Sequence, residues 1–445
     1  MRCLGASIRK SITHNHASNM KRYLILLLVY LPLLLTAQTP QHHHPQSTRI
    51  SQSINLFGLQ MYQELSETEG NLFFSPISMH TAFTMVWMGA RGETREEMSG
   101  VLQFSLAPGE GEREMAFGYG QVLDQLNPDS NTVTLKMSNA VWVQEDMGLQ
   151  PAFEDILRAQ MQAPPRPVNF REAPMEVREQ INQRVAEQTE DKIQDLMPED
   201  SIDGDTRMVL TNAIYFKGDW ASAFPEASTH PAPFHLSRDE SVAVPMMHQK
   251  GRFAGRRLSN GGEALVLPYA GDRVVMLILL PPEEVAGQPV DHPLAAWEAT
   301  LPDVNAEDPE QLHEMETLFM EAFDQVHPQT HVYLPRFTMT QTFDLVDTMK
   351  NLGMPRAFDP VNADFSGMTS EERLFIGAAV HKSFVEVNET GTEAAAATGI
   401  AMQRLSAVID EPPPRVFRAD RPFFFMLIDT RTNSTLFMGR IVDPR

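Results

Sequence analysis

The spacing of apolar residues changes along the chain, from helical spacing in the first half to strand-like spacing in the second. Over residues 50–65 apolar residues recur every three or four positions, which predicts an amphipathic helix. Further helices are predicted over residues 75–88, 93–104, 112–127, 151–161 and 175–193, interrupted by strands at 71–74 and 133–144. Beyond residue 207 the pattern predicts strands at 208–216, 242–253, 263–267, 274–280, 331–337 and 374–388, and one helix at 342–352. Helices followed mostly by strands are typical of an α+β fold.

Residues 50–445 are predicted to form a single domain. A length of 445 residues would by itself suggest two or three domains. However, no linker rich in Pro, Gly and Ser divides this part of the chain, and no repeat of about 20–50 residues is visible in it. One large domain is therefore the simpler interpretation.

Residues 386–406 do not have the composition of an ordinary solvated connector. Four consecutive alanines stand where Gly, Pro, Asn, Asp and Ser are usual. As a strand, the segment would carry no charge on one face, which would consist of Thr392, Ala394, Ala396, Thr398, Ile400 and Met402. Such a face can be buried without burying an unpaired charge, so the segment is suited to enter a sheet. The alternative is an exposed Ala-rich helix or linker, since alanine is the best helix former.

Several short motifs together resemble one known family. They lie at residues 71–78 (NLFFSPIS), 89–94 (GARGET), 212–220 (NAIYFKGDW), 363–367 (ADFSG), 389–398 (ETGTEAAAAT), 417–427 (FRADRPFFFML) and 436–440 (LFMGR). In order and approximate spacing they resemble the serpin family of protease inhibitors, from about residue 50 to the end of the sequence. The resemblance implies a helical bundle plus three β-sheets, with an exposed reactive-centre loop at about residues 389–412.

The resemblance also implies roles for individual residues. Counting from Gly391, as in inhibitory serpins, places the bond cut by a target protease at Leu405–Ser406, and the alternative register places it at Arg404–Leu405. The hinge of the loop would comprise Glu389, Gly391, Thr392, Glu393, Ala394, Ala395, Ala396, Ala397 and Thr398. The residues that match the family's sheet-opening shutter are Ser75, Ser78, Asn212 and His381. Each of these four would also serve as a buried, hydrogen-bonded polar group.

The function implied by the resemblance is inhibition of serine endopeptidases by a suicide-substrate mechanism. A protease attacks the loop and forms an acyl-enzyme, and the cleaved loop then inserts into the central sheet as a new strand. A strand over residues 392–403 would span ~40 Å at ~3.3 Å per residue, which is far enough to carry an attached protease across a domain. The expected partner is therefore a serine protease held in a covalent complex.

Two features of the loop leave the target and the function open. Leu405 would suit a chymotrypsin-, chymase-, cathepsin G- or elastase-like enzyme with an apolar pocket, whereas Arg404 would suit a trypsin-like enzyme. The small residues at 392 and 394–397 favour inhibition over a non-inhibitory serpin, such as a carrier, storage protein or chaperone. A further alternative is a cross-class inhibitor of papain-like cysteine proteases, some of which would also accept leucine.

The N-terminus has the pattern of a secretory signal. Lys21 and Arg22 precede an apolar run over residues 23–35, which is followed by small residues suited to cleavage. We therefore expect residues 1–37 to be a signal peptide, with Met20 as its start, and the mature protein to be secreted into the extracellular space. No stretch of the sequence reaches the ~20 apolar residues of a membrane span, so no membrane association is expected.

Residues 38–49 are expected to be a disordered tail, because they are rich in Gln, Pro, Ser and Thr. They include three adjacent histidines at 42–44, but no second cluster completes a metal site. The only cysteine, Cys3, precedes the expected signal, so the mature chain would contain no disulfide.

The chain is strongly acidic, with a formal net charge of −22. Such a surface repels nucleic acid and sulfated polysaccharide. Some serpins are accelerated by glycosaminoglycans through a basic helix, but the corresponding residues 111–127 contain Arg113 as their only base. We therefore expect no nucleic-acid partner and no heparin-type activation, and we expect a monomer.

The sequence contains no motif for enzymatic chemistry. It has no G-x-S-x-G elbow, H-E-x-x-H helix, C-x-x-C pair, P-loop or dinucleotide-binding fingerprint, so neither enzymatic activity nor a cofactor or metal is expected. Two sequons mark Asn388 and Asn433 as glycosylation candidates, and Asn433 is preferred because Asn388 abuts the hinge. Residues 303–327 lie in a stretch longer than the family pattern, and we interpret them as a surface insertion, with a partner-binding element as the alternative.

Overall fold

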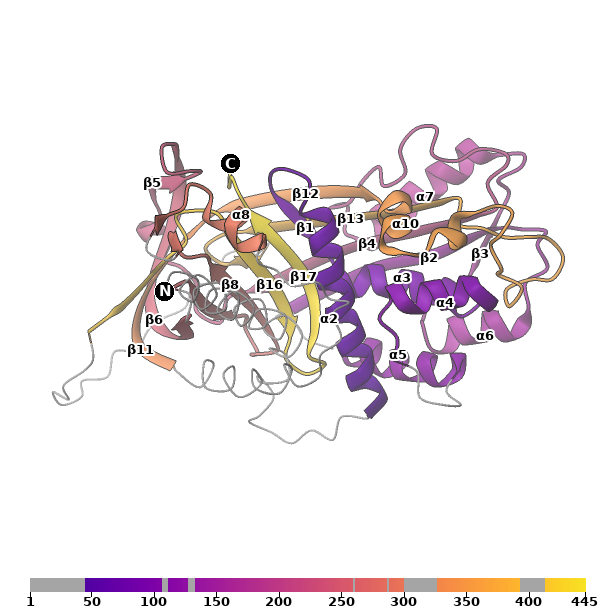
Figure 1. The fold of residues 1–445 in the computed structure, drawn as a ribbon, viewed down its shortest axis with the longest axis horizontal. Helices are drawn as coiled ribbons and strands as arrows, with labels where there is room; N and C mark the ends of the chain where they lie inside the picture. The colour runs from indigo at the N-terminus through magenta and orange to yellow at the C-terminus, as the bar shows by residue number, and fades with distance from the viewer. Residues whose placement is uncertain are drawn as a thin grey trace, which may run out of the picture.

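The computed structural model describes residues 45–105, 111–126, 133–258, 261–285, 288–299, 326–392 and 413–445. Within these residues the strands form a six-stranded sheet, a nine-stranded sheet and a two-stranded ribbon. Figure 1 shows the six-stranded sheet running along the long axis of the molecule, with α3, α4, α5, α6 and α7 gathered toward one end and β5, β6 and β11 at the other. The α+β fold predicted from the order of helices and strands is confirmed.

The helices follow the predicted order with small shifts at their ends. They are α2 (Pro45–Leu65), α3 (Pro76–Trp87), α4 (Gly92–Val101), α5 (Glu112–Leu126), α6 (Pro151–Ala159), α7 (Pro174–Gln188), α8 (Pro293–Glu298) and α10 (Val346–Leu352), with 3₁₀ turns η1 (Glu226–Ser228) and η2 (Pro355–Phe358). Because α2 begins at Pro45, the part of the predicted disordered tail from residue 45 to 49 is helical instead. No helix in the described part of the chain is long and apolar enough to cross a membrane.

Each predicted strand overlaps an observed strand, but the strands at 166–168, 230–235, 415–418, 423–429 and 434–441 were not predicted. They are β1 (Leu72–Phe74), β2 (Val133–Gln144), β3 (Arg166–Val168), β4 (Met208–Asp219), β5 (His230–His235), β6 (Ser241–Arg257), β7 (Glu263–Pro268), β8 (Val274–Leu280), β9 (Glu284–Val285), β10 (Gln288–Pro289), β11 (Val326–Pro335), β12 (Phe337–Asp344), β13 (Ala378–Val387), β14 (Gly391–Thr392), β15 (Arg415–Arg418), β16 (Phe423–Asp429) and β17 (Ser434–Ile441). The helix predicted from residue 342 begins only at Val346, because β12 continues to Asp344 along β13. The single strand predicted at 331–337 is divided between β11 and β12.

The six-stranded sheet has the order β12-β13-β14-β4-β2-β3, and both of its faces are covered around β4 and β13, whereas alternate residues of the edge strand β12 are exposed. One face packs on the main core, which includes the wholly buried helix α3. On the other face, Val177, Ile181 and Val185 of α7 form a second apolar cluster with sheet residues such as Trp142 and Ala213. The helix α7 therefore lies over β2 and β4, on the side opposite α3. Any strand added between β13 and β4 must fit between these two apolar layers.

Candidate functional site

The strands β13 and β4 form a seam in the six-stranded sheet that is closed over most of its length and open at one end. They pair directly in parallel from Ala378 opposite Val209 to Phe384 opposite Tyr215. Beyond this point β14 lies between them, with Thr392 opposite both Val387 and Gly218. The two residues of β14 therefore already occupy the position of an additional antiparallel strand between β13 and β4.

Gly391 makes the closest backbone approach at this end of the seam. A Cβ atom at residue 391 would lie 2.0 Å from the carbonyl oxygen of Gly218 and 2.7 Å from the Cα atom of Asp219. No real Cβ contact is this short, and the obstructing atoms are backbone that cannot move aside. Glycine is therefore required at 391 for the chain to enter the sheet here.

Thr392 is fully buried and faces the main core. Its hydroxyl shares a 2.7 Å hydrogen bond with the Tyr269 hydroxyl. The ring of Tyr269 stacks on Trp220, with the ring centroids 4.5 Å apart. Trp220 in turn donates from Nε1 to the carbonyl oxygen of Asn388 at 3.0 Å, and from its backbone N–H to that of Thr390 at 2.8 Å. The two aromatic residues hold the segment at the start of the loop against the end of β4.

Glu389 fastens the chain just before β14. Its side chain is buried, and its carboxylate accepts a 2.7 Å hydrogen bond from Arg336 Nε and another from the Thr229 hydroxyl. Its backbone carbonyl accepts from Phe224 N–H at 2.8 Å. Burial raises the pKa of Glu389, but the hydrogen bonds from Arg336 and Thr229 outweigh it, so the pKa lies below its ordinary value. The carboxylate is therefore charged and paired at neutral pH.

The four residues predicted to form the shutter lie together under the closed part of the seam. Ser75 is the N-cap of α3, and its hydroxyl donates to the carbonyl oxygen of Leu436 at 2.6 Å. The backbone N–H of Ser75 donates to His381 Nε2 at 3.2 Å, which joins α3 to β13. Asn212 on β4 donates from Nδ2 to the Ser78 hydroxyl at 2.5 Å, which joins α3 to the other side of the seam.

His381 and Asn212 connect the two strands of the seam directly. Because a backbone N–H can only donate, His381 Nε2 must be the accepting nitrogen, so Nδ1 carries the proton and donates to Asn212 Oδ1. Burial lowers the pKa of His381 to about 3, which keeps this neutral tautomer at physiological pH. Opening the seam at this point breaks the hydrogen bond between His381 and Asn212.

Sequence reasoning missed Asn139 as a member of the same network. It lies on β2 directly opposite Asn212, and its Oδ1 accepts from both the Ser78 hydroxyl, at 3.1 Å, and Asn212 Nδ2. No local signal in the sequence identifies Asn139, because its position depends on how β2 and β4 pair. Trp220 lies in the motif at residues 212–220, but that motif gave it no role. Tyr269, Arg336 and Thr229 were not predicted as site residues.

The remaining site predictions are only partly accessible to the structure. The hinge residues Glu393, Ala394, Ala395, Ala396, Ala397 and Thr398, and the bond region Arg404, Leu405 and Ser406, lie outside the described residues, as do residues 303–325 of the expected insertion. The Asn388 side chain is half-buried, and its Oδ1 accepts from Thr390 N–H at 3.0 Å. Asn433 is only 6% exposed. Neither sequon presents an open acceptor in the folded chain, and their glycosylation stays a prediction.

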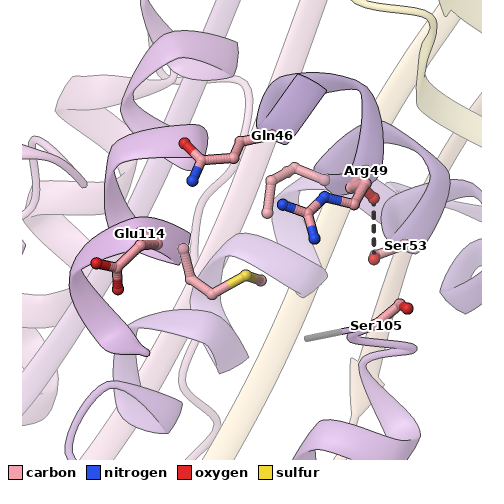
Figure 2. A pocket seen from close by; sticks show the side chains of 7 residues that line it. Gln46, Arg49, Ser53, Ser105 and Glu114 are labelled. Atoms are coloured by element: carbon pink, nitrogen blue, oxygen red, sulfur yellow. Dashed lines mark hydrogen bonds between the residues drawn. The ribbon is translucent and has the colours of Figure 1, made fainter. Parts of the chain in front are cut away.

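Helix α5 lies in the region 111–127, for which no heparin-type activation was expected, and its first turn contains Glu112 and Glu114. Figure 2 shows a small cavity between α2 and α5, where Arg49 lies on one side and Glu114 on the other. Its volume is about 10 Å³, enough for about one water molecule. Glu112, also on α5, forms ion pairs with Arg91, at 3.2 Å, and with Arg95. Among the described residues no cluster of three potential metal ligands occurs.

Comparison with known proteins identifies the family. The family model described as "Serpin (serine protease inhibitor)" matches residues 52–444. The chain belongs to the serpin family. This serpin is 36% identical over 402 residues to an uncharacterized serpin-like protein of Thermococcus kodakarensis, covering 90% of this chain and 87% of that protein. It is 33% identical over 414 residues to human Serpin B10, covering 89% of this chain and 99% of Serpin B10.

Solved serpin structures have the same fold. Uncleaved ovalbumin matches with a TM-score of 0.74 and 29% identity, over 89% of this chain and all of the ovalbumin chain. Human thyroxine-binding globulin matches with a TM-score of 0.74 and 26% identity, over 90% of this chain and 99% of that chain. The family and the serpin fold expected from the motifs are therefore confirmed.

Proposed function

We propose that this serpin inhibits serine endopeptidases as a suicide substrate, by inserting its cleaved loop between β13 and β4. The observation that carries the proposal is the position of β14. At the open end of the seam Thr392 lies opposite both strands and Gly391 opposite β4, and below this point β13 and β4 pair directly with each other. The loop therefore needs only to continue the strand that it has begun.

The strand registers on the two sides of the seam are mutually consistent. Continued residue by residue, the antiparallel register of β14 brings Thr398 opposite Asn212 on β4 and opposite His381 on β13. These two residues already face each other across the closed seam. An inserted strand would therefore need no slip of either neighbour, and its residues 395–401 would replace the direct pairing of β13 with β4.

The composition of the loop fits the two layers that would enclose it. The burial of Thr392 assigns the inward face to residues of the same parity, so Ala394, Ala396 and Thr398 would face the core beside α3. On the outer face Ala397 would lie opposite Ala213 and beneath the apolar cluster around α7. Small residues on both faces add a strand without overpacking either layer. The charged Glu393 would lie at the level of Lys217, which is only half-buried.

A non-inhibitory serpin is the second candidate, because the family includes at least one structure named for binding a small molecule, thyroxine-binding globulin. In that case the chain would act as a carrier and the loop would not insert on cleavage. The small side chains and uncharged inner face of residues 392–402 favour insertion, so inhibition remains the proposal.

For the target, we propose a protease with an apolar primary pocket that cuts after Leu405. Cleavage after Arg404 by a trypsin-like enzyme is the alternative, and one residue of register separates the two. We also propose that the protein is secreted, on the strength of the charged and apolar pattern that follows Met20. N-terminal sequencing of protein recovered outside the producing cell, beginning near residue 38, would test the secretion proposal.

The proposed target is tested by incubating the purified protein separately with chymotrypsin and with trypsin. A complex with chymotrypsin that survives denaturing electrophoresis, together with a released peptide beginning at Ser406, is the expected result. A peptide beginning at Leu405 in a complex with trypsin would move the target to trypsin-like enzymes. Cleavage of the loop by both proteases without a stable complex would contradict the inhibitory function and favour the carrier function.

A further inference from the structure

A row of cations lies on the solvent side of β6, in an otherwise acidic chain. Residues 248–257 contain Lys250, Arg252, Arg256 and Arg257 and no acidic residue, although the formal net charge of the chain is −22. Because side chains alternate along a strand, His248, Lys250 and Arg252 share one face, and both Lys250 and Arg252 are exposed. Positive charge is therefore concentrated on this strand, although the chain as a whole is acidic.

The neighbouring strands extend the same face. In the sheet Tyr333 of β11 lies opposite both His248 and Arg418 of β15, so the three side chains form one transverse row. The Arg418 guanidinium lies 3.6 Å from the centroid of the Tyr333 ring, and the His248 ring stacks on Tyr333 at 4.4 Å. On β15 Val416 is 52% exposed. We define the β6–β11–β15 face by His248, Lys250, Arg252, Tyr333, Val416 and Arg418.

The side chains of this face are held in place but only partly neutralised. His248 Nε2 is 3.1 Å from His331 Nδ1, which fixes both rings beside Tyr333. Arg418 has one acidic neighbour, Asp420, at 3.9 Å. Within the described part of the chain neither Lys250 nor Arg252 has an acidic side chain within ion-pair distance. A half-buried tyrosine and arginine and an exposed valine, beside two exposed cations, have the composition of a protein-binding surface.

The face lies next to the point where the reactive-centre loop rejoins the sheet. β15 begins at Arg415 and pairs with β11, so this strand connects the C-terminal end of the loop to the β6–β11–β15 face. Only eight residues lie between Ser406 and Arg415, so the nine Cα–Cα steps that join them span at most ~30 Å. A serine protease of ~240 residues has a radius of gyration of ~18 Å, so an enzyme bound at residue 405 extends over the surface around the loop.

We propose that the β6–β11–β15 face is a second contact surface for the target protease and binds an acidic loop on that enzyme. The inference rests on the proposed inhibitory function and adds a determinant of target choice outside the scissile bond. Charge complementarity at such a contact raises the association rate more than it changes the later chemical steps. The face should therefore affect how fast the complex forms, and not whether the loop inserts.

The test compares two double variants that change the net charge equally. Lys250→Gln/Arg252→Gln removes two cations from the face, whereas Arg158→Gln/Arg431→Gln removes two exposed cations elsewhere. Arg158 lies on α6, at the opposite end of the molecule from β6 (Figure 1). Association rate constants are measured with chymotrypsin at about 0.02 M and about 1 M NaCl, between which the screening length falls from roughly 20 Å to about 3 Å.

The expected result is that Lys250→Gln/Arg252→Gln associates roughly 3- to 10-fold more slowly than wild type at low salt, with the difference lost at high salt. The Arg158→Gln/Arg431→Gln control should keep the wild-type rate, and all three proteins should give the same stoichiometry and thermal midpoint. Equal rates for wild type and the face variant, or equal losses in both variants, would overturn this inference while leaving the inhibitory function intact.

Two further outcomes are informative. Weaker retention of the face variant on a heparin column, together with wild-type rates against chymotrypsin, would overturn the protease assignment and indicate that the face binds a sulfated polymer. Absence of any covalent complex with wild-type protein would overturn the proposed function together with the inference that rests on it.

Discussion

At the scale of single residues, the seam is controlled by a few buried polar side chains whose hydrogen bonds cross it. His381 accepts from α3 and donates to Asn212, so it links three elements at once. Its neutral state is part of this arrangement, because a second proton on Nε2 would remove the acceptor for Ser75 N–H. His80, a buried residue of α3, also has its pKa lowered to about 3 by burial. Both histidines therefore make the fold sensitive to acid.

The first prediction concerns that acid sensitivity. A histidine whose folded pKa is about 3 and whose unfolded pKa is about 6.5 contributes nothing above pH 6.5 and destabilises the fold progressively below it. Each such histidine costs ~1.4 kcal/mol per pH unit between these values. His381→Gln should lower stability at pH 7.5 but lose stability less steeply than wild type between pH 6 and pH 4. Urea unfolding midpoints across this range provide the measurement, and an unchanged slope would contradict the assigned role.

The second prediction concerns Thr392, whose side chain faces the core at the entrance to the seam. Thr392→Arg would place a charge against the buried Tyr269 hydroxyl, at a cost of several kcal/mol. Insertion should slow relative to release of the protease, so that at least ~10-fold more inhibitor is consumed per protease trapped. Titration of chymotrypsin activity measures this stoichiometry.

Glu393→Arg is the matched control for Thr392→Arg, because it introduces the same side chain one residue later, on the opposite face of the same strand. It should inhibit like wild type. Equal loss of inhibition in both variants would show that the inward face assigned to Thr392 is wrong.

At the scale of elements, the sequence predicted the strands of the sheet better than their partners. The strand at 133–144 was predicted with the observed ends, because apolar and polar positions alternate over residues 133–138 and a short apolar run follows at 140–143. The helix predicted from residue 342 was wrong at its start, because residues 342–344 are held as strand by pairing with β13. Such pairing joins residues far apart in the chain, and local spacing carries no information about it.

The candidate site shows the same limit. Ser75, Ser78 and Asn212 lie within motifs that resemble the family, and His381 was assigned by its match to the family's shutter; the structure brings all four together. Asn139 belongs to the same network but became visible only through the pairing of β2 with β4. The cation face likewise depends on three strands meeting in one register, which no single segment reveals.

The third prediction is a gain in stability when the loop is cut. An inserted strand of about ten residues would form new hydrogen bonds on both sides, each worth ~1 kcal/mol net. A gain of about 10 kcal/mol would raise the thermal midpoint by roughly 10–15 °C in a domain of about 400 residues, because the unfolding entropy is ~2.1 cal/mol/K per residue. Protein nicked in the loop by a protease that it does not trap should therefore unfold at a much higher temperature than intact protein, as followed by circular dichroism. A midpoint unchanged by nicking would indicate that the loop does not insert.

At the level of the whole molecule, loop insertion and the proposed second contact with the protease involve different parts of the fold. The seam with its buried hydrogen bonds lies between α3 and α7, and the β6–β11–β15 face lies on strands at the opposite end from α6 (Figure 1). The loop joins the two, since it follows β14 and precedes β15. Protease capture and loop insertion are thereby separated in space and can be altered separately by substitution.

Inhibition by loop insertion requires β13 and β4 to separate, so a disulfide that can be formed and reduced across the seam tests the proposed mechanism. Lys382 and Ala213 are directly opposite each other on the two strands, where adjacent Cα atoms lie ~4.8 Å apart, within the range for a disulfide. Cysteines are introduced as Lys382→Cys/Ala213→Cys in a chain whose only natural cysteine is replaced by Cys3→Ser. The same protein is then assayed with chymotrypsin after oxidation and after reduction.

We expect the oxidised protein to be cleaved in its loop and to release active chymotrypsin. The reduced protein should form a covalent complex that survives denaturing electrophoresis. The single variants Lys382→Cys and Ala213→Cys should form the complex under both conditions. Equal yields of complex from the oxidised and reduced double variant would contradict insertion through this seam.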